Sequence, residues 1–227
     1  MKRLLLMVLA ALILFGGVGG VEGAVQDGEF SVATFTPQGI VKGKPAVTVV
    51  FSQPAAAKES VGRPVAADKL PLTFSPRLRG EGKWTDEKTF VFTPSSALPQ
   101  ATLFRCTVSD ALRDLQGRRL SGRQTFEFST EALKLLSVRQ SDFSNDRATL
   151  DLNFNLPVTP QRLRGFLTIL NEQKGTVEYT VFGNAPASMV QVAFYPSDAS
   201  KFTAVVAPGL TSDAGPLGTT TTGQFPV

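Results

Sequence analysis

Apolar and polar residues alternate along much of this chain, and one such run occurs twice. Val47–Pro54 and Leu150–Pro157 each nearly alternate, reach a Phe, and end three residues later in a Pro. The second run begins 103 residues after the first. A repeat of this size is the length of one β-sandwich. The pattern therefore predicts two sandwiches in tandem.

A second matched pair supports the repeat. Phe104 followed by Leu112–Gly117 corresponds to Phe202 followed by Leu210–Gly215, with an offset of 98 residues. Between these anchors, β-branched and aromatic runs are bounded by Gly, Pro, Asp or Asn, as in antiparallel strands. The expected strands are residues 30–35, 45–51, 70–74, 89–93, 102–108 and 124–129, then 133–138, 148–154, 163–170, 175–182, 191–195 and 202–207.

The predicted fold is therefore all-β, with two tandem antiparallel β-sandwiches at residues 24–130 and 131–227. No stretch keeps a helical period, and residues 131–138 fit a strand as well as a helix. The second unit ends differently from the first, because Phe225 falls where a last strand should begin. We expect this sandwich to be truncated at its C-terminal end. The alternative is a shortened last strand built from residues 219–222 and Phe225.

The N-terminus has the pattern of a secretory signal peptide. Lys2 and Arg3 precede an apolar run that ends at Phe15, and small residues lead to a plausible cleavage site before Ala24. The apolar run is shorter than the ~20 residues that span a bilayer, which favours cleavage of residues 1–23 over an uncleaved anchor. The sequence thus predicts an exported protein of the periplasm or cell envelope, in contact with the membrane only if this segment stays attached.

The amino-acid composition limits the kinds of partner that the protein is expected to bind. The 227 residues are 42% hydrophobic and 19% charged, with a net charge of +4. The basic residues are scattered, and their densest group, Arg113–Arg123, is interpreted as a solvated loop with a polyanion contact as the alternative. A nucleic-acid partner is not expected, because it needs a concentrated basic face. The 17 Phe residues are expected to fill the cores.

Catalytic chemistry is largely excluded by what the sequence lacks. The chain has no His, so neither a Ser-His-Asp nor a Cys-His arrangement can form, and it has no phosphate-binding glycine motif. The lone Cys106 is expected to be a buried free thiol without a disulfide partner. We therefore predict no enzyme, and no catalytic, cofactor-binding or metal-binding residues.

Two weaker alternatives stay open at this point. Asp86, Glu87, Asp110 and Asp114 could form a carboxylate or Ca²⁺ site, although Asp114 fits a turn former better. Trp84 could be an exposed platform for a carbohydrate, although a single Trp in a sandwich more often packs in the core or at its rim.

Motifs in the first unit resemble the bacterial Ig-like domain of surface-layer proteins. The match spans about 100 residues, and its parts come in the family's order. The matching positions are Phe35-Thr-Pro-Gln-Gly39, Phe51-Ser-Gln-Pro54, Trp84, Thr89–Pro94, Leu98-Pro99, Thr102, Val108, Asp114, Gly117 and Phe126-Glu-Phe-Ser-Thr130. The resemblance implies a sandwich that binds or spaces rather than catalyses.

The tandem arrangement also resembles the N-terminal region of bacterial alpha-2-macroglobulins. The second unit contributes Phe154, Pro157-Val158, Pro160, Leu163 and Leu167–Leu170. The resemblance implies a parent that traps proteases in the periplasm by means of a bait segment and a Cys-Gly-Glu-Gln thioester. This chain lacks that motif, because Cys106 is followed by Thr107 and Val108. It could supply only leading scaffold modules, with proteases as partners of the parent.

Two functions from different classes remain. The first is a set of non-catalytic scaffold modules of such an endopeptidase inhibitor. The second is an exported Ig-like spacer, adhesion or binding module of the cell envelope, with other envelope proteins as partners. Neither implies a cofactor or a small-molecule substrate. Edge strands are where self-association is expected, because their main-chain groups are unpaired.

Overall fold

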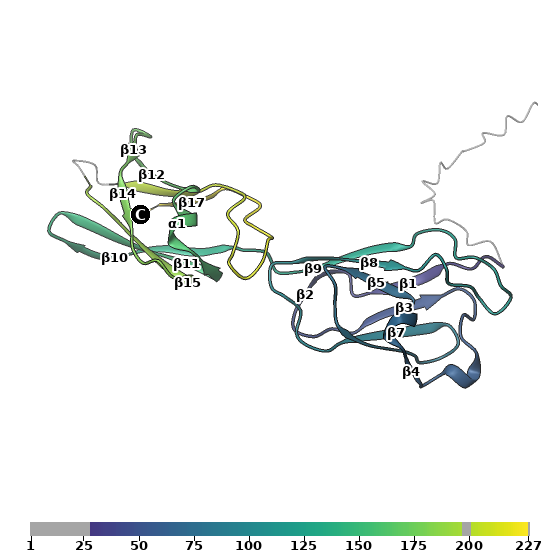
Figure 1. Ribbon diagram of the computed structural model, residues 1–227. Coiled ribbons are helices and arrows are strands. Elements are labelled where there is room, and N and C mark those ends of the chain that lie inside the picture. The colour runs from purple at the N-terminus through teal and green to yellow at the C-terminus, as the bar shows by residue number, and fades with distance from the viewer. Residues whose placement is uncertain (1–27, 197–200, 227) are drawn as a thin grey trace, which may run out of the picture.

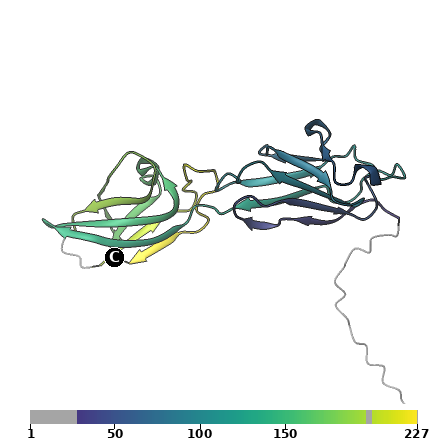
Figure 2. The same ribbon diagram turned by 90° about the horizontal axis from the view of Figure 1, so that it is seen from below.

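The computed structural model describes residues 28–196 and 201–226, which fold into two β-sandwiches lying end to end (Figures 1 and 2). The predicted signal peptide, residues 1–23, lies outside the described residues. Strands dominate both halves, and most neighbouring strands are antiparallel. The all-β fold class, with two tandem sandwiches, is confirmed.

The first sandwich has one sheet in the order β1-β3-β7-β6-β4 and a second in the order β2-β9-β8-β5. All pairs are antiparallel except β2 and β9, which run parallel. Two short 3-10 turns, η1 (Lys58–Ser60) and η2 (Ala67–Lys69), flank β4. The strands are β1 (Val32–Thr36), β2 (Gly39–Val41), β3 (Val47–Phe51), β4 (Pro64–Val65), β5 (Leu72–Ser75), β6 (Gly80–Trp84), β7 (Thr89–Pro94), β8 (Leu103–Val108) and β9 (Thr125–Thr130).

Phenylalanine fills the space between these sheets. On β3, Val47, Val49 and Phe51 point inward and are buried, as the alternation predicts. A buried Phe contributes about 1.5–3 kcal/mol and needs no hydrogen-bond partner. The fully buried rings are Phe30, Phe35, Phe51, Phe90, Phe92, Phe104 and Phe128.

The second sandwich has sheets in the orders β10-β11-β15-β14 and β13-β12-β16-β17, all antiparallel. Its core is mainly aliphatic and centres on Leu150, Leu152 and Phe154 of β11. The elements are β10 (Leu135–Ser144), β11 (Arg147–Val158), α1 (Pro160–Leu163), β12 (Leu167–Asn171), β13 (Thr176–Val177), β14 (Tyr179–Val181), β15 (Ala187–Phe194), β16 (Phe202–Val206) and β17 (Gly223–Pro226).

The sequence repeat occupies equivalent places in the two sandwiches. β3 lies between β1 and β7, just as β11 lies between β10 and β15. β8 lies between β5 and β9, just as β16 lies between β12 and β17, and each carries a buried Phe of the second matched pair, Phe104 and Phe202.

The two sandwiches differ at their first strand. In the first, the chain leaves one sheet at Thr36, the end of β1, and joins the other at Gly39 as β2. Gly39 has a φ of +69°, which is the left-handed conformation that favours glycine. In the second sandwich, β10 pairs with β11 only. Among the described strands, β17 is therefore hydrogen-bonded to β16 alone.

Several predicted strands need correction. Residues 163–170 are not one strand, because Pro160 starts the short helix α1 and β12 begins only at Leu167. Residues 175–182 divide into β13 and β14, which belong to different sheets. β2 and β4 were not predicted because they have only three and two residues. β17 pairs with β16 and contains Phe225, as the alternative of a shortened last strand expects, but residues 219–222 are not part of it. Truncation of this sandwich stays a prediction.

Candidate functional site at the junction of the sandwiches

Leu217 joins the two sandwiches through its main chain. Its N–H donates to the carbonyl of Ala101 at 2.7 Å, and its carbonyl accepts from the N–H of Leu133 at 3.0 Å. Ala101 lies just before β8 of the first sandwich, yet its side chain is fully buried in the core cluster of the second. A residue of one sandwich is thus packed into the other.

Gly215 allows this close approach. A Cβ at this position would clash with the carbonyl oxygen of Gln100 and lie 2.8 Å from that of Ala101. Both obstacles are main-chain atoms, which cannot rotate away as the end of a side chain could. The loop that carries Gly215 and Leu217 therefore fits the first sandwich only because residue 215 has no side chain.

Side-chain hydrogen bonds fix the covalent connection beside this loop. Asn155 donates from Nδ2 to the carbonyl of Ala132 at 2.9 Å and accepts the N–H of Lys134 at Oδ1 at 2.7 Å. On the other side, Thr130 Oγ1 donates to the carbonyl of Pro99 at 2.7 Å and accepts the N–H of Thr102 at 3.0 Å. The connecting segment is therefore held at both of its ends.

A shallow pocket of about 480 Å³ opens beside the connection. Its charged groups are Lys42 and Glu131, and Glu131 forms an ion pair with Lys134 at 2.9 Å. The hydrogen bond and charge of Lys134 hold the pKa of Glu131 below its usual value. Only one carboxylate lines the pocket, so it holds no acid–base pair of carboxylates. The lining residues are Val41, Lys42, Gly43, Ala97, Leu98, Gln100, Thr130, Glu131, Asn155 and Leu156.

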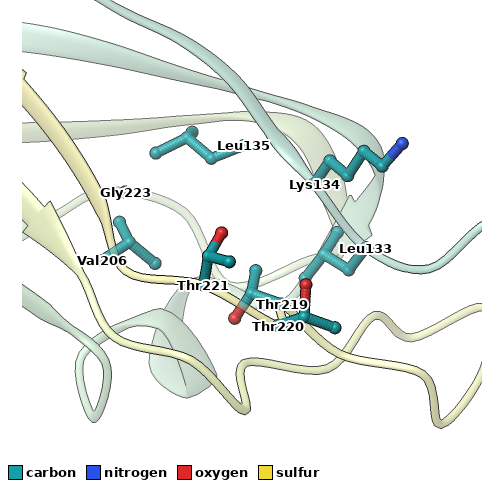
Figure 3. A pocket seen from close by; sticks show the side chains of 8 residues that line it. All are labelled: Leu133, Lys134, Leu135, Val206, Thr219, Thr220, Thr221 and Gly223. Carbon is teal, nitrogen blue, oxygen red and sulfur yellow. The ribbon is translucent and has the colours of Figure 1, made fainter. Parts of the chain in front are cut away.

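A second pocket, of about 260 Å³, lies where β10 enters the second sandwich (Figure 3). In the first sandwich, Phe35 of β1 and Phe126 of β9 stack with ring centroids 4.5 Å apart. In the second sandwich the strand registers place Val138 and Phe225 at these positions, so an aliphatic side chain replaces one of the two rings. Figure 3 shows Leu133 and Leu135 on the β10 side and Thr219, Thr220 and Thr221 leading toward β17. The pocket is thus a packing gap lined by aliphatic and hydroxyl groups.

Cys106 is buried in the core of the first sandwich, with a free thiol. Burial raises the pKa of its thiol to about 12, so almost none of it is thiolate at neutral pH. The thiolate is the reactive form, and the residue therefore acts as a small apolar side chain.

Asp114 organises the arginine-rich loop from within. Its carboxylate is fully buried and accepts the N–H groups of Gln116 at 3.0 Å and Arg118 at 2.8 Å, together with Arg118 Nε at 2.5 Å. Burial raises the pKa of Asp114, but these hydrogen bonds and the charge of Arg118 outweigh burial and leave the pKa below its usual value. The structure thus gives Asp114 the turn-forming role, and Arg118 neutralises it.

The other candidate carboxylates do not join Asp114 in a site. Asp86 accepts the N–H groups of Lys88 at 2.8 Å and Thr89 at 2.9 Å in the turn between β6 and β7. The hydrogen bond from Lys88 is the main reason that its pKa is lowered. Within residues 28–196 and 201–226, no three His, Cys, Asp or Glu side chains are grouped so that they could hold a metal ion.

Trp84 is buried rather than displayed. Its ring lies 5.1 Å from that of Phe90 and 5.7 Å from that of Phe51, measured between centroids, and 7% of the residue is exposed. This excludes the alternative that Trp84 is a carbohydrate platform.

Residues 26–130 match the family model described as "Bacterial Ig-like domain". The first sandwich resembles a bacterial Ig-like domain. The match covers the segment in which the sequence motifs lie, and it leaves the second sandwich unassigned.

No curated protein matches the chain. None of the helices that the structure describes is long and apolar enough to cross a membrane.

Solved structures give low overall similarity. L,D-transpeptidase 3 from Mycobacterium tuberculosis, in complex with a faropenem-derived adduct, is 15% identical over 67% of this chain and 63% of that chain, with a TM-score of 0.30. This chain thus spans less than two thirds of that one. An L,D-transpeptidase from Mycobacterium tuberculosis H37Rv is 15% identical over 74% and 76%, with a TM-score of 0.30.

The N-terminal part of the bacterial S-layer protein SbsC is 12% identical over 88% of this chain and 43% of that chain, with a TM-score of 0.31. The relation to alpha-2-macroglobulins stays a prediction from motifs.

The contacts at the junction could not be predicted from the sequence. Ala101 and Leu217 belong to no motif. Asn155 and Gly215 lie in the repeated runs and Thr130 lies in the Ig-like motif, but these patterns do not indicate a contact between the sandwiches. A glycine fixed by contact with another sandwich looks in sequence like any turn glycine.

Proposed function

We propose that this chain is a non-catalytic, exported structural segment whose two Ig-like sandwiches are held at a fixed angle to space or scaffold neighbouring parts of the cell envelope. The junction carries the proposal. Leu217 is hydrogen-bonded to both sides, Ala101 is buried across the boundary, and Gly215 lies directly against the main chain of Gln100 and Ala101. A flexible linker would need none of these contacts.

The chemistry of the side chains supports a non-catalytic role. The single thiol is buried and protonated, Asp114 is neutralised by Arg118, and Trp84 is in the core. The chain has no His to act as a general base. The signal-peptide pattern supports export to the periplasm or envelope. Detection of a new N-terminus at Ala24, by mass spectrometry of the periplasmic fraction of expressing cells, would test that part.

Rigidity can be tested with residual dipolar couplings on residues 24–227. If the sandwiches form one body, couplings from both fit a single alignment tensor. Gly215→Ala should separate the two tensors, because the added Cβ pushes against main-chain carbonyls. Gly165→Ala is the matched control, since its Cβ would meet only the carbonyl of Arg162, at an ordinary 3.7 Å. Independent tensors in the unmodified protein would exclude the rigid-spacer proposal.

A second candidate is that the segment is the leading scaffold of an alpha-2-macroglobulin-like protease inhibitor. The motifs from Phe35 to Thr130 and from Phe154 to Leu170 favour it. Its buried motif residues, such as Phe35, Phe154 and Leu163, are core side chains, which suits a scaffold. Reading the native gene beyond codon 227 tests it. An open frame that encodes further sandwiches and Cys-Gly-Glu-Gln would support it, and an unrelated downstream gene would leave the envelope spacer.

A further inference from the structure

A shallow pocket of about 280 Å³ lies on the outer face of the sheet β10-β11-β15-β14 in the second sandwich. Leu150 of β11, Val192 of β15 and Val181 of β14 point into the core. Their neighbours along each strand therefore point outward, because side chains alternate between the two faces of a sheet. The pocket includes Arg147 at the start of β11, whereas Asn155 of the junction lies near the other end of that strand. The pocket is thus remote from the junction (Figure 1).

Small side chains form the floor of this pocket. Ala193 of β15 lies opposite Thr180 of β14 on one side and Thr149 of β11 on the other. Ala193 faces outward yet is only 3% exposed, because the larger side chains of Phe182 and Tyr195 lie around it. A row of small residues between large ones makes a depression in the face of the sheet. Its volume is just below the ~300–1,000 Å³ of sites for drug-sized ligands, which suits one ring of a longer ligand.

Two exposed aromatic rings flank this floor. Phe182 follows β14 and is 39% exposed, and Tyr195 follows β15 and is 67% exposed. Among the described residues, the only other exposed aromatic side chain is that of Phe143, since Phe otherwise fills the cores or is half-buried. Exposure of apolar rings to water is unfavourable. Two of these three rings in one pocket therefore indicate a binding surface.

Polar groups without partners converge on the same pocket. The guanidinium group of Arg147 lies over the ring of Phe182, 5.9 Å from its centroid. In the part of the chain that the structure describes, the side chains of Arg147, Glu178 and Thr180 form neither an ion pair nor a hydrogen bond. They offer N–H donors, carboxylate acceptors and a hydroxyl group. This combination complements a ligand that has apolar faces and a polar rim.

The sheet face next to the pocket is polar. Asp151 accepts hydrogen bonds from Ser141 and from Gln191, each at 2.9 Å. The apolar area is therefore confined to the pocket, whereas a stable protein interface buries about 800 Å² of each partner around an apolar centre. A small ring with hydroxyl groups fits this arrangement better than a protein surface does.

We propose that this pocket binds one pyranose ring of a glycan. The ring lies over Ala193 with its C–H groups against Phe182 and Tyr195, and its hydroxyl groups form hydrogen bonds with Arg147 and Glu178. Sugars whose ring substituents are all equatorial, such as β-linked glucose and N-acetylglucosamine, fit best, because both faces of their rings carry only C–H groups. A wholly apolar ligand would bury the polar groups without partners, which is costly.

The site would bind a glycan without cleaving it. Glu178 is the only carboxylate that lines the pocket, and glycoside hydrolysis uses a pair of carboxylates. The proposal does not depend on the spacer role or on the junction.

The test is a titration of isotope-labelled residues 24–227 with soluble tetrasaccharides, followed by amide shifts in NMR spectra. Cellotetraose and chitotetraose have all-equatorial β-linked rings, and maltotetraose, whose α-linkages are axial, is the control sugar. We expect one or both of the first two to bind with a dissociation constant of about 1 mM or tighter. The shifts should centre on the amides of Thr180, Ala193 and Tyr195, and maltotetraose should bind more weakly.

Variants assign the binding to the pocket. Tyr195→Ala and Phe182→Ala should each weaken binding roughly fivefold, because each removes a ring that the sugar contacts. Phe143→Ala, the same truncation of an exposed ring outside the pocket, should leave binding unchanged. Thr180→Tyr fills the floor with a side chain that suits a strand and should abolish binding. All of these residues are exposed, so the variants are expected to fold, and unchanged amide shifts in the first sandwich would confirm that they do.

Three outcomes would overturn the proposal. One is that neither cellotetraose nor chitotetraose shifts the amides of the pocket at about 10 mM. Another is that maltotetraose binds equally well, or that binding survives Tyr195→Ala and Thr180→Tyr. The third is that the amides of Phe182 and Tyr195 shift with protein concentration in the absence of sugar, which would show that a second copy of the chain covers the pocket.

Discussion

The carbonyl of Pro157 accepts a hydrogen bond from the N–H of Asp213 at 3.0 Å, and the carbonyl of Pro54 accepts one from the N–H of Leu115 at the same distance. Pro54 and Pro157 end the repeated run, and Leu115 and Asp213 lie in the repeated loops. The repeat therefore preserves a main-chain hydrogen bond between the end of a central strand and a loop. A Pro can serve there because the bond uses its carbonyl, which Pro retains.

Separating the sandwiches should affect them unequally. Residues 24–130 should fold alone, because Ala101 is the main residue among them that is buried in the core of the second sandwich. Residues 131–227 should melt about 10 °C below the same sandwich in the joined chain, since Leu217 loses a hydrogen bond and the core loses Ala101. Differential scanning calorimetry of the two pieces and the joined chain measures this. Equal melting temperatures for the second sandwich would mean that the junction adds no stability, and the division at residue 130 would be supported on both sides.

Replacing Asp114 by Ala should cost about 2 kcal/mol in the free energy of unfolding. The N–H groups of Gln116 and Arg118 would lose their buried acceptor. Asp110→Ala removes the same charge from an exposed position nearby and should change stability by less than about 0.5 kcal/mol. Urea unfolding followed by fluorescence of Trp84, the chain's single Trp, reports on this sandwich. Similar costs for the two variants would contradict the structural role of Asp114.

Acid should destabilise the first sandwich through the same residue. The pKa of Asp114 is lower in the folded state than in the unfolded chain, so folding favours its ionised form. This contribution is complete above the unfolded value, ~3.9, and is lost as the pH falls through the lower folded-state pKa. Asp86 acts in the same direction. Asp114→Asn should flatten the fall in stability below about pH 4, and an unchanged pH profile would refute the assignment.

Cys106 should resist thiol reagents until the chain unfolds. A thiol with a pKa of about 12 is only about one part in ten thousand thiolate at pH 8. Iodoacetamide at pH 8 should therefore modify the protein in concentrated urea but not in buffer, as mass spectrometry would show. Cys106→Ser should destabilise the sandwich by about 1–3 kcal/mol, because it buries a hydroxyl, and Cys106→Ala, which buries none, is its control. Rapid modification in buffer would show that the strand opens readily.

The alternation of apolar and polar residues was enough to predict the central strands of both sandwiches. Val47–Phe51 and residues 148–154 bury every second side chain, and this period is visible without any partner strand. Short edge strands such as Pro64–Val65 could not be found this way, because two residues define no period. The division of residues 175–182 between two sheets was also hidden, since a strand that crosses from one sheet to the other keeps its β-branched composition.

The candidate sites were harder to predict from the sequence than the strands. Asp114 and Trp84 could be interpreted from local sequence, because turn chemistry and core packing depend on near neighbours. The junction depends instead on Gly215 meeting Gln100 and Ala101, more than 100 residues earlier in the chain.

The junction between the sandwiches is built from a glycine and two main-chain carbonyls, and this determines how it responds to a change in ionic strength. Exposed ion pairs weaken as ionic strength rises, because mobile ions screen them. The contacts of Leu217 with Ala101 and Leu133 are between main-chain dipoles, and Ala101 is fully buried. The angle between the sandwiches should therefore be the same in dilute and concentrated salt, and the proposed spacer would keep the same reach in both.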